Sequence, residues 1–198
     1  MPKKRKGSRT SFRTYLAFIP AAILVGFIVY LVAVPPASNI STIGTTGRTT
    51  LVSGAQAPAF KLNLIDGNGV KEEVFEFNPA SGKYVFMDFI HEWCVHCRNM
   101  AQTIDRLHAS YKDKGVVFIT VAGGYNTDAQ KTANYLKQHD VSWTVVFDKQ
   151  LDVFSRYGVR GTPTYVIISP AGSILAKFEG EQSYDALARE LDRHLVVR

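Results

Sequence analysis

The feature that most constrains this 198-residue chain is the position of its only two cysteines. They form the segment Cys94-Val95-His96-Cys97, which lies between two different hydrophobic patterns. Residues 84–90 (YVFMDFI) are almost continuously apolar, as in a strand that is buried on both faces. Beyond the cysteines, apolar residues recur with helical period at Met100, Ile104, Leu107 and Tyr111. The cysteine pair is therefore expected where a buried strand ends and a helix begins.

The remainder of the body, from about residue 57 onward, alternates strand and helix patterns. Strands are expected at 59–64, 74–77, 116–122, 143–147, 164–168 and 174–178. Helices are expected at 128–138, at 150–157 and along the stripe of Leu187, Leu191 and Leu195. This alternation predicts an α/β fold, in which helices flank a central, largely parallel sheet. The last two strands, joined by a Pro-Ala-Gly turn, add an antiparallel edge.

The amino terminus predicts a membrane anchor. Residues 15–34 form an uncharged apolar run, which as a helix would be about 30 Å long, the thickness of the hydrocarbon core of a bilayer. A cleaved signal peptide is the alternative, although its apolar region usually has only roughly 7–15 residues. We therefore expect an uncleaved, single-pass transmembrane helix at 15–34.

Charge predicts the orientation of this anchor. Six of the 23 Lys and Arg residues lie in the basic segment 1–14, and such segments stay cytoplasmic; a nuclear-localisation signal is the weaker interpretation. The other 17 basic residues match the 17 acidic ones, so nucleic-acid binding is not expected. Residues 35–56, rich in Pro, Ser, Thr and Gly, indicate a flexible linker, in which Asn39 fits a glycosylation triplet. Residues 57–198 should then form an extracytoplasmic domain.

The position of the cysteine pair predicts redox chemistry. A helix N-terminus carries unpaired N–H groups and a partial positive charge, both of which favour a thiolate. Cys94 is therefore the expected nucleophile, and Cys97, one helical turn further, is the thiol that resolves a mixed disulfide. An imidazolium at His96 would stabilise the Cys94 thiolate and make the couple more oxidising.

Three other uses of a cysteine pair are a structural disulfide, a zinc site and a soft-metal site. A disulfide across so short a loop contributes only about 2 kcal/mol, and a zinc site needs four ligands where the sequence offers no second pair. A copper or other soft-metal binding or transfer module remains the alternative, because His91 and His96 lie beside Cys94 and Cys97. No cofactor is expected; in particular, Arg98 stands where covalent haem attachment requires histidine.

Two segments resemble the hallmarks of thioredoxin-like proteins. Residues 88–98 (DFIHEWCVHCR) resemble their active-site segment, and residues 158–164 (GVRGTPT) resemble the loop that ends in a cis-proline. The leading 57–60 (APAF) and the Asp66-Gly67 turn are similar to one branch, the membrane-anchored TlpA/ResA-like thiol–disulfide oxidoreductases. The resemblance covers roughly residues 55–197. It implies a thioredoxin-like fold with a central mixed sheet and an N-terminal β extension.

The resemblance also implies roles for residues near the cysteines. Trp93, Thr162 and Pro163 are expected to bind the client, with the Thr162–Pro163 bond cis rather than an ordinary trans turn. Asp88 matches the buried acid of the family. Burial would raise the pKa of its carboxyl group and allow it to accept the proton of Cys97. The alternative for Asp88 is a loop-capping residue at the rim of the strand.

His91 and Glu92, just before Trp93, are expected to be solvated loop residues.

The apolar segment at 15–34, the cysteine pair and the resemblance together predict a membrane-anchored enzyme that exchanges disulfides with client proteins and is regenerated by a separate redox partner. The direction of electron flow, the clients and the oligomeric state stay open.

Overall fold

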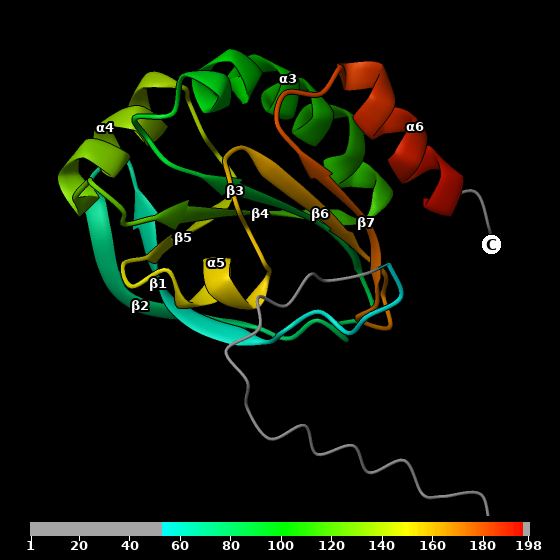
Figure 1. The fold of residues 1–198 in the computed structure, drawn as a ribbon. Helices are drawn as coiled ribbons and strands as arrows, with labels where there is room; N and C mark the ends of the chain where they lie inside the picture. The colour runs from blue at the N-terminus through cyan, green and yellow to red at the C-terminus, as the bar shows by residue number, and fades with distance from the viewer. Residues whose placement is uncertain (1–52, 196–198) are drawn as a thin grey trace, which may run out of the picture. The chain divides into compact units, whose positions relative to one another are not determined.

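The computed structural model describes residues 53–195, and a seven-stranded sheet lies at the centre of this part of the chain (Figure 1). β3 (Tyr84–Ile90) is an interior strand of this sheet, and its bounds agree with the prediction. β4 (Val116–Gly123) pairs in parallel with β3, and β5 (Thr144–Asp148) pairs in parallel with β4. Every residue of β3 after Tyr84 is buried, which confirms that both faces of this strand are covered.

Antiparallel strands complete the sheet on both sides. β6 (Thr164–Ile168) pairs with the free edge of β3, and β7 (Ile174–Glu179) pairs with β6. On the other side, a hairpin of β1 (Phe60–Asp66) and β2 (Gly69–Phe77) joins the sheet at β5. The resulting order is β2-β1-β5-β4-β3-β6-β7, with the N-terminal β extension that the resemblance implied. The expectation of a largely parallel sheet is wrong, because only the β3–β4 and β4–β5 pairings are parallel and the hairpin β1–β2 adds antiparallel strands at the second edge.

β2 is longer than the strand expected at 74–77. Its first residues pair with β1 from Gly69 onward, although most of their side chains are exposed. Val70 and Val74 are 43% and 55% exposed on this edge strand. Hydrophobic patterning therefore missed the first half of β2, because backbone hydrogen bonds and not buried side chains hold it.

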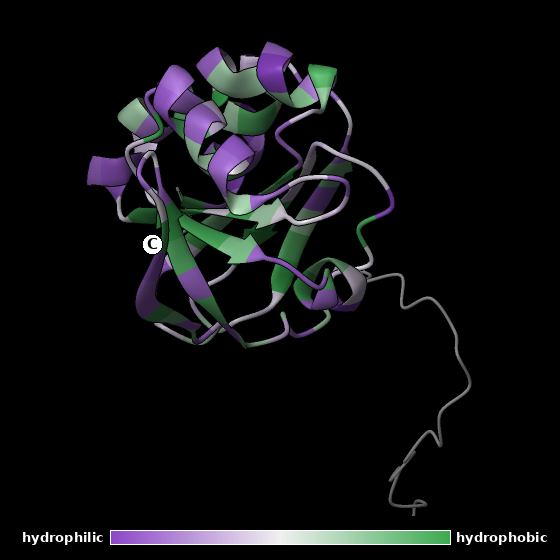
Figure 2. Ribbon diagram, turned by 90° about the vertical axis from the view of Figure 1, so that its left-hand side faces the viewer, coloured by the Kyte–Doolittle hydropathy of each residue, from purple (hydrophilic) through white to green (hydrophobic). Residues whose placement is uncertain are grey.

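The helices cover both faces of the sheet. α3 (Val95–Tyr111), α4 (Ala129–Gln138) and α6 (Tyr184–Leu195) lie on one face, and α5 (Asp152–Arg156) lies on the other (Figure 1). A short 3-10 turn, η1 (Lys112–Lys114), follows α3. The polar faces of the helices turn outward, whereas the apolar strands lie between the two layers (Figure 2). α5 is shorter than the helix expected at 150–157.

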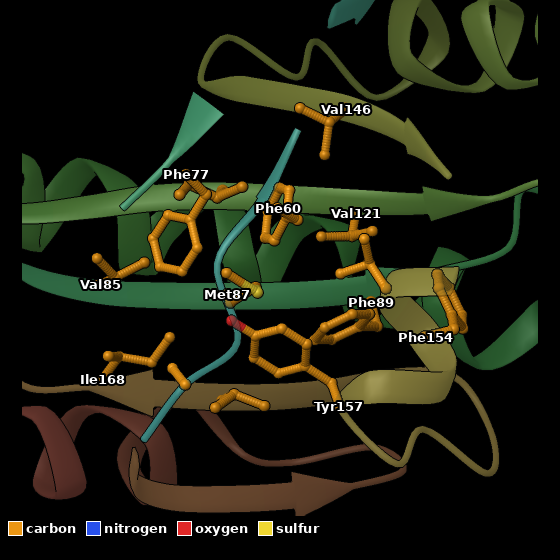
Figure 3. Close-up of a cluster of buried hydrophobic side chains, with 14 of the residues drawn as sticks. Phe60, Phe77, Val85, Met87, Phe89, Val121, Val146, Phe154, Tyr157 and Ile168 are labelled. Atoms are coloured by element: carbon orange, nitrogen blue, oxygen red, sulfur yellow. The ribbon is translucent and has the colours of Figure 1, made fainter. Parts of the chain in front are cut away.

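Successive side chains of β3 point to opposite faces of the sheet. Met87 and Phe89 pack with Phe154 and Tyr157 in the core between the sheet and α5 (Figure 3). Phe86 and Ile90 face the opposite layer, where they pack with buried residues of α3 and α4. Asp88, which lies between Phe86 and Ile90 in the strand, therefore points to the same face, toward α3.

The folded part begins before residue 57. The N–H groups of Gly54 and Ala57 donate to the carbonyl oxygens of Ile174 and Gly172, at 2.8 and 2.9 Å. The predicted cytoplasmic segment 1–14, the anchor 15–34 and the linker up to residue 52, with Asn39, lie outside the described residues. Between residues 53 and 195, none of the helices has the length and apolar character needed to cross a membrane.

Candidate active site

Cys94 is the N-cap of α3. Its backbone is extended (φ −71°, ψ 115°), and its Sγ accepts a hydrogen bond from the N–H of Cys97 at 3.2 Å. The loop from β3 is held by a bond from the N–H of Cys94 to the carbonyl oxygen of His91, at 3.0 Å. A sulfur at this position receives an unpaired helix N–H and the positive end of the helix dipole. Reactive cysteines are typically found at such helix N-termini.

Cys97 lies in the first turn of α3, and both cysteines are reduced and buried. Burial raises the pKa of the Cys97 thiol well above its ordinary value, and the neighbouring Cys94 sulfur and Asp88 carboxyl add to the rise. Cys97 therefore keeps its proton until a base removes it. The two cysteines occupy different environments, one facing the helix N-terminus and the other an apolar interior.

Asp88 is buried in the middle of β3, with 6% of its surface exposed. Burial raises the pKa of its carboxyl group from 3.8 to about 8. Oδ1 of Asp88 has no hydrogen-bond partner among the described residues. The alternative that Asp88 caps a loop at the strand rim is wrong, because the residue lies inside the strand with its neighbours buried on both sides.

A cavity of about 20 Å³ lies beneath the first turns of α3, with room for roughly one water molecule. Its polar lining includes Asp88, Cys97, Tyr135 and Tyr165. The hydroxyl of Tyr165, like Oδ1 of Asp88, is buried without a hydrogen-bond partner among the described residues. Asp88 and Tyr165 are opposite each other in the β3–β6 pairing. The structure thus places the buried acid and the buried thiol at one small, mostly apolar pocket.

The loop before β6 brings Thr162 and Pro163 beside the cysteines. The Thr162–Pro163 peptide bond is cis, as predicted. Sγ of Cys94 lies 3.2 Å from the carbonyl oxygen of Thr162, to which the thiol donates. A backbone acceptor and the sulfur of Cys94 therefore lie side by side, although 68 residues separate them in the sequence.

Trp93 and two residues that the sequence did not single out form an exposed surface next to Cys94. Trp93, Val95 and Tyr125 are 44%, 52% and 54% exposed. Nε1 of Trp93 donates to the carbonyl oxygen of Tyr125 at 2.8 Å. Tyr125 follows the end of β4, and the adjacent parallel strand β3 ends just before Trp93. Because neighbouring parallel strands end at the same edge of a sheet, this position could have drawn attention to Tyr125.

The sequence suggested that His91 is a solvated loop residue, and this expectation is wrong. His91 is 9% exposed, and its ring stacks on Trp93 with centroids 5.1 Å apart and planes 6° from parallel. Nδ1 of His91 donates to the carbonyl oxygen of Gly123 at 3.0 Å, and Phe154 packs against the ring with centroids 5.0 Å apart. Burial lowers the pKa of His91. The ring of His91 thus packs against one face of the Trp93 indole and holds it in place.

His96 is exposed on α3, and its ring is held by a residue that the sequence did not single out. Nδ1 of His96 lies 2.7 Å from Oε1 of Glu181, in the loop between β7 and α6. The structure therefore directs His96 toward a carboxylate 85 residues further along the chain.

Glu92, the second residue expected to be solvated, accepts a hydrogen bond from Oγ1 of Thr127 at 2.7 Å.

The soft-metal alternative finds no support in this arrangement. Within residues 53–195, no group of three or more His, Cys, Asp or Glu side chains is arranged to hold a metal ion. The two histidines proposed as ligands, His91 and His96, bond to Gly123 and Glu181.

The sheet order, the cysteines at the helix N-terminus and the adjacent cis-proline define a thioredoxin-like redox protein. The chain matches the AhpC/TSA family over residues 53–177 and belongs to that family. It is a thiol–disulfide oxidoreductase, in agreement with the names of its relatives. ResA of Bacillus thuringiensis subsp. konkukian is 30% identical over 140 residues, which cover 71% of this chain and 77% of that protein.

Further relatives agree with this result. Thiol–disulfide oxidoreductase ResA of Bacillus subtilis is 29% identical over 134 residues, 68% of this chain and 71% of the relative. A crystal structure assigned as a thiol:disulfide interchange protein DsbE from Chlorobium tepidum is similar, with a TM-score of 0.66 and 28% identity, over 74% of this chain and 99% of that one. The thioredoxin domain of a Bacteroides vulgatus thiol–disulfide oxidoreductase has a TM-score of 0.61 and 26% identity, with the same coverage.

Proposed function

We propose that this protein exchanges disulfides with client proteins through its Cys94-Val95-His96-Cys97 site. The observation that carries the proposal is the pairing of Cys94, as N-cap of α3, with Cys97 in a buried position one turn further. A sulfur at a helix N-terminus beside a buried second thiol is the arrangement that two-step thiol–disulfide exchange uses.

In the first step, the Cys94 thiolate attacks a client disulfide. The client S–S bond breaks, a Cys94–client S–S bond forms, and one client sulfur leaves as a thiolate. The N–H of Cys97 and the dipole of α3 stabilise the attacking thiolate. The backbone carbonyl of Thr162, 3.2 Å from Sγ, marks where the client backbone would pass the nucleophile.

In the second step, Cys97 resolves the mixed disulfide. Asp88, in the ionised form that is partly populated at a pH near its pKa of about 8, accepts the proton of Cys97, whose sulfur then attacks the sulfur of Cys94. The Cys94–client bond breaks, and the client leaves with both electrons of the enzyme's dithiol. A pKa of about 8 brings Asp88 closer to the raised pKa of Cys97 than an exposed aspartate would be. The same steps in reverse oxidise a client dithiol.

The client surface that we propose consists of Trp93, the adjacent Tyr125 and the half-buried Thr162, with the buried Pro163 shaping its edge. Exposed aromatic side chains contribute large contact areas at low entropic cost, which suits recognition of varied polypeptides. Trp93 is held in place by its bond to Tyr125 and its stacking on His91, so that the surface is formed before a client arrives.

We also propose that residues 15–34 anchor the protein in the cell membrane, with residues 1–14 cytoplasmic and the catalytic domain extracytoplasmic. The uncharged run at 15–34 and the six basic residues before it support this topology. A membrane-bound site away from the cytosol would need a separate redox partner to regenerate it. A measured reduction potential near about −270 mV would identify a reductant, and one near about −120 mV an oxidant.

Trapping of a mixed disulfide tests the proposed exchange. Replacement of Cys97 by alanine leaves Cys94 able to attack but removes the resolving thiol. We expect the full-length C97A variant to form a stable, reductant-sensitive adduct with insulin, a model protein that contains disulfides. The matched C94A variant should form none. Equal trapping by C94A, or none by C97A, would contradict the assigned roles.

A further inference from the structure

The loop between β7 and α6 is attached to the active site. Gly180, with φ +79°, donates its N–H to the carbonyl oxygen of Pro163 at 2.8 Å. Its neighbour Glu181 is therefore held beside the cis-proline, opposite the first turns of α3. The positive φ at Gly180 favours glycine, so the direction of this loop is built into the sequence.

Two side chains of α3 converge on the same oxygen of Glu181. Nδ1 of His96 lies 2.7 Å from Oε1, and Nδ2 of Asn99 donates to Oε1 at 2.8 Å. His96 and Asn99 are three residues apart and lie on one face of the helix. These two hydrogen bonds lower the pKa of Glu181, which is therefore a carboxylate at neutral pH. A protonated His96 forms an ion pair with it.

Cys94 makes its hydrogen bonds to other groups. Its Sγ accepts from the N–H of Cys97 and faces the carbonyl oxygen of Thr162. The sequence suggested that His96 stabilises the Cys94 thiolate and makes the couple oxidising. The structure instead directs its ring toward a carboxylate. An imidazolium in an ion pair offers a nearby thiolate less net charge than a free one.

We propose that Glu181 is a positioning residue that sets the reduction potential of the Cys94–Cys97 couple by holding His96 away from the Cys94 thiolate. The anchored imidazole leaves the dithiol form without an added stabilising charge, and the couple stays more reducing than the His96 position alone suggests. This inference rests on the proposed exchange reaction. It assigns redox tuning to a residue far from the cysteines in sequence.

The experiment measures the equilibrium of the full-length protein with glutathione. In this reaction one enzyme disulfide and two glutathione thiols give one enzyme dithiol and one glutathione disulfide. We expect E181A to raise the equilibrium constant about threefold to tenfold, because the freed imidazole can approach Cys94 and stabilise its thiolate. A tenfold change corresponds to about 30 mV for a two-electron couple.

Three further variants separate anchoring from other effects. E181Q should give a smaller shift than E181A, because its amide oxygen can still accept from His96. E179A removes a nearby exposed carboxylate that pairs with Lys177, and should change the constant less than about twofold. In an H96Q background, E181A should likewise have less than about a twofold effect, because the imidazole is absent.

The outcomes separate the two proposals. If E181A has no effect, or shifts the constant equally in the H96Q background, Glu181 does not act through His96 and the inference is overturned. If H96Q alone lowers the constant severalfold, His96 already acts on Cys94, which also overturns it. If the wild-type disulfide does not equilibrate with glutathione at all, the proposed exchange reaction itself fails.

Discussion

Replacement of Asp88 by asparagine removes a titrating group from the centre of the fold. Asparagine has nearly the same shape, so the packing around β3 is retained. The folded protein holds the Asp88 proton up to a pKa of about 8, whereas an unfolded chain releases it near 3.8. The folded state therefore binds more protons at Asp88 between these values, and the contribution of Asp88 to the free energy of unfolding falls as the pH rises through this window.

The magnitude follows from the width of the window. Each pH unit between the two pKa values costs about 1.4 kcal/mol, and the window from 3.8 to about 8 gives on the order of 6 kcal/mol in all. The D88N variant lacks this loss. We expect its stability relative to the wild type to increase by roughly 1 kcal/mol per pH unit between pH 5 and pH 8.

The assay is denaturant unfolding of both reduced proteins across this pH range, followed by tryptophan fluorescence. Subtraction of the wild-type curve from the D88N curve removes the titrations that the two proteins share. In parallel, the D88N enzyme should resolve a preformed Cys94 mixed disulfide about 100-fold more slowly, since it lacks the base. A pH-independent stability difference would refute the buried-acid argument. Unchanged resolution would refute the proton transfer while leaving the burial intact.

Two further predictions concern other parts of the chain. A Cβ at Gly123 would lie 2.8 Å from Cζ of Phe154 and also against the ring of His91, so G123A should cost about 1–3 kcal/mol of stability and shift the fluorescence of the stacked Trp93. G161A is the control, because its Cβ meets nothing within 4 Å; equal loss in both variants would contradict the argument. The proposed anchor predicts that the protein stays in membranes after alkaline washing and that deletion of residues 1–34 releases it. Release of the intact chain by the wash would refute the anchor.

Features that depend on neighbouring residues were predictable from the sequence. The apolar run at 84–90 and the helical period after it located β3 and α3 within a residue or two. The place of Cys94 at the start of the helix followed from the junction of these patterns. The cis bond at Pro163 was also expected, although from resemblance rather than from local physics.

The first half of β2 and the burial of His91 show where such reasoning ends. The first half of β2 is held by backbone hydrogen bonds to β1, and its side chains are mostly exposed. Its sequence therefore carries no alternation of apolar and polar residues that would reveal a strand. His91 is covered by Trp93 and by Phe154, which is 63 positions away in the sequence. Whether a loop residue is buried depends on partners that only the folded chain supplies.

By itself, the sequence determined the chemistry of this protein: two cysteines three positions apart at the start of a helix, on an α/β scaffold. Local spacing suffices for this, because helix period and strand alternation act between near neighbours. The tertiary structure alone decided the environment of that chemistry. It enclosed Asp88 and Tyr165 at one cavity, and it brought Glu181 to His96 across 85 residues. Electrostatic interactions and burial depend on distance in space, so the packing of distant segments determines which groups lie close enough to affect the site.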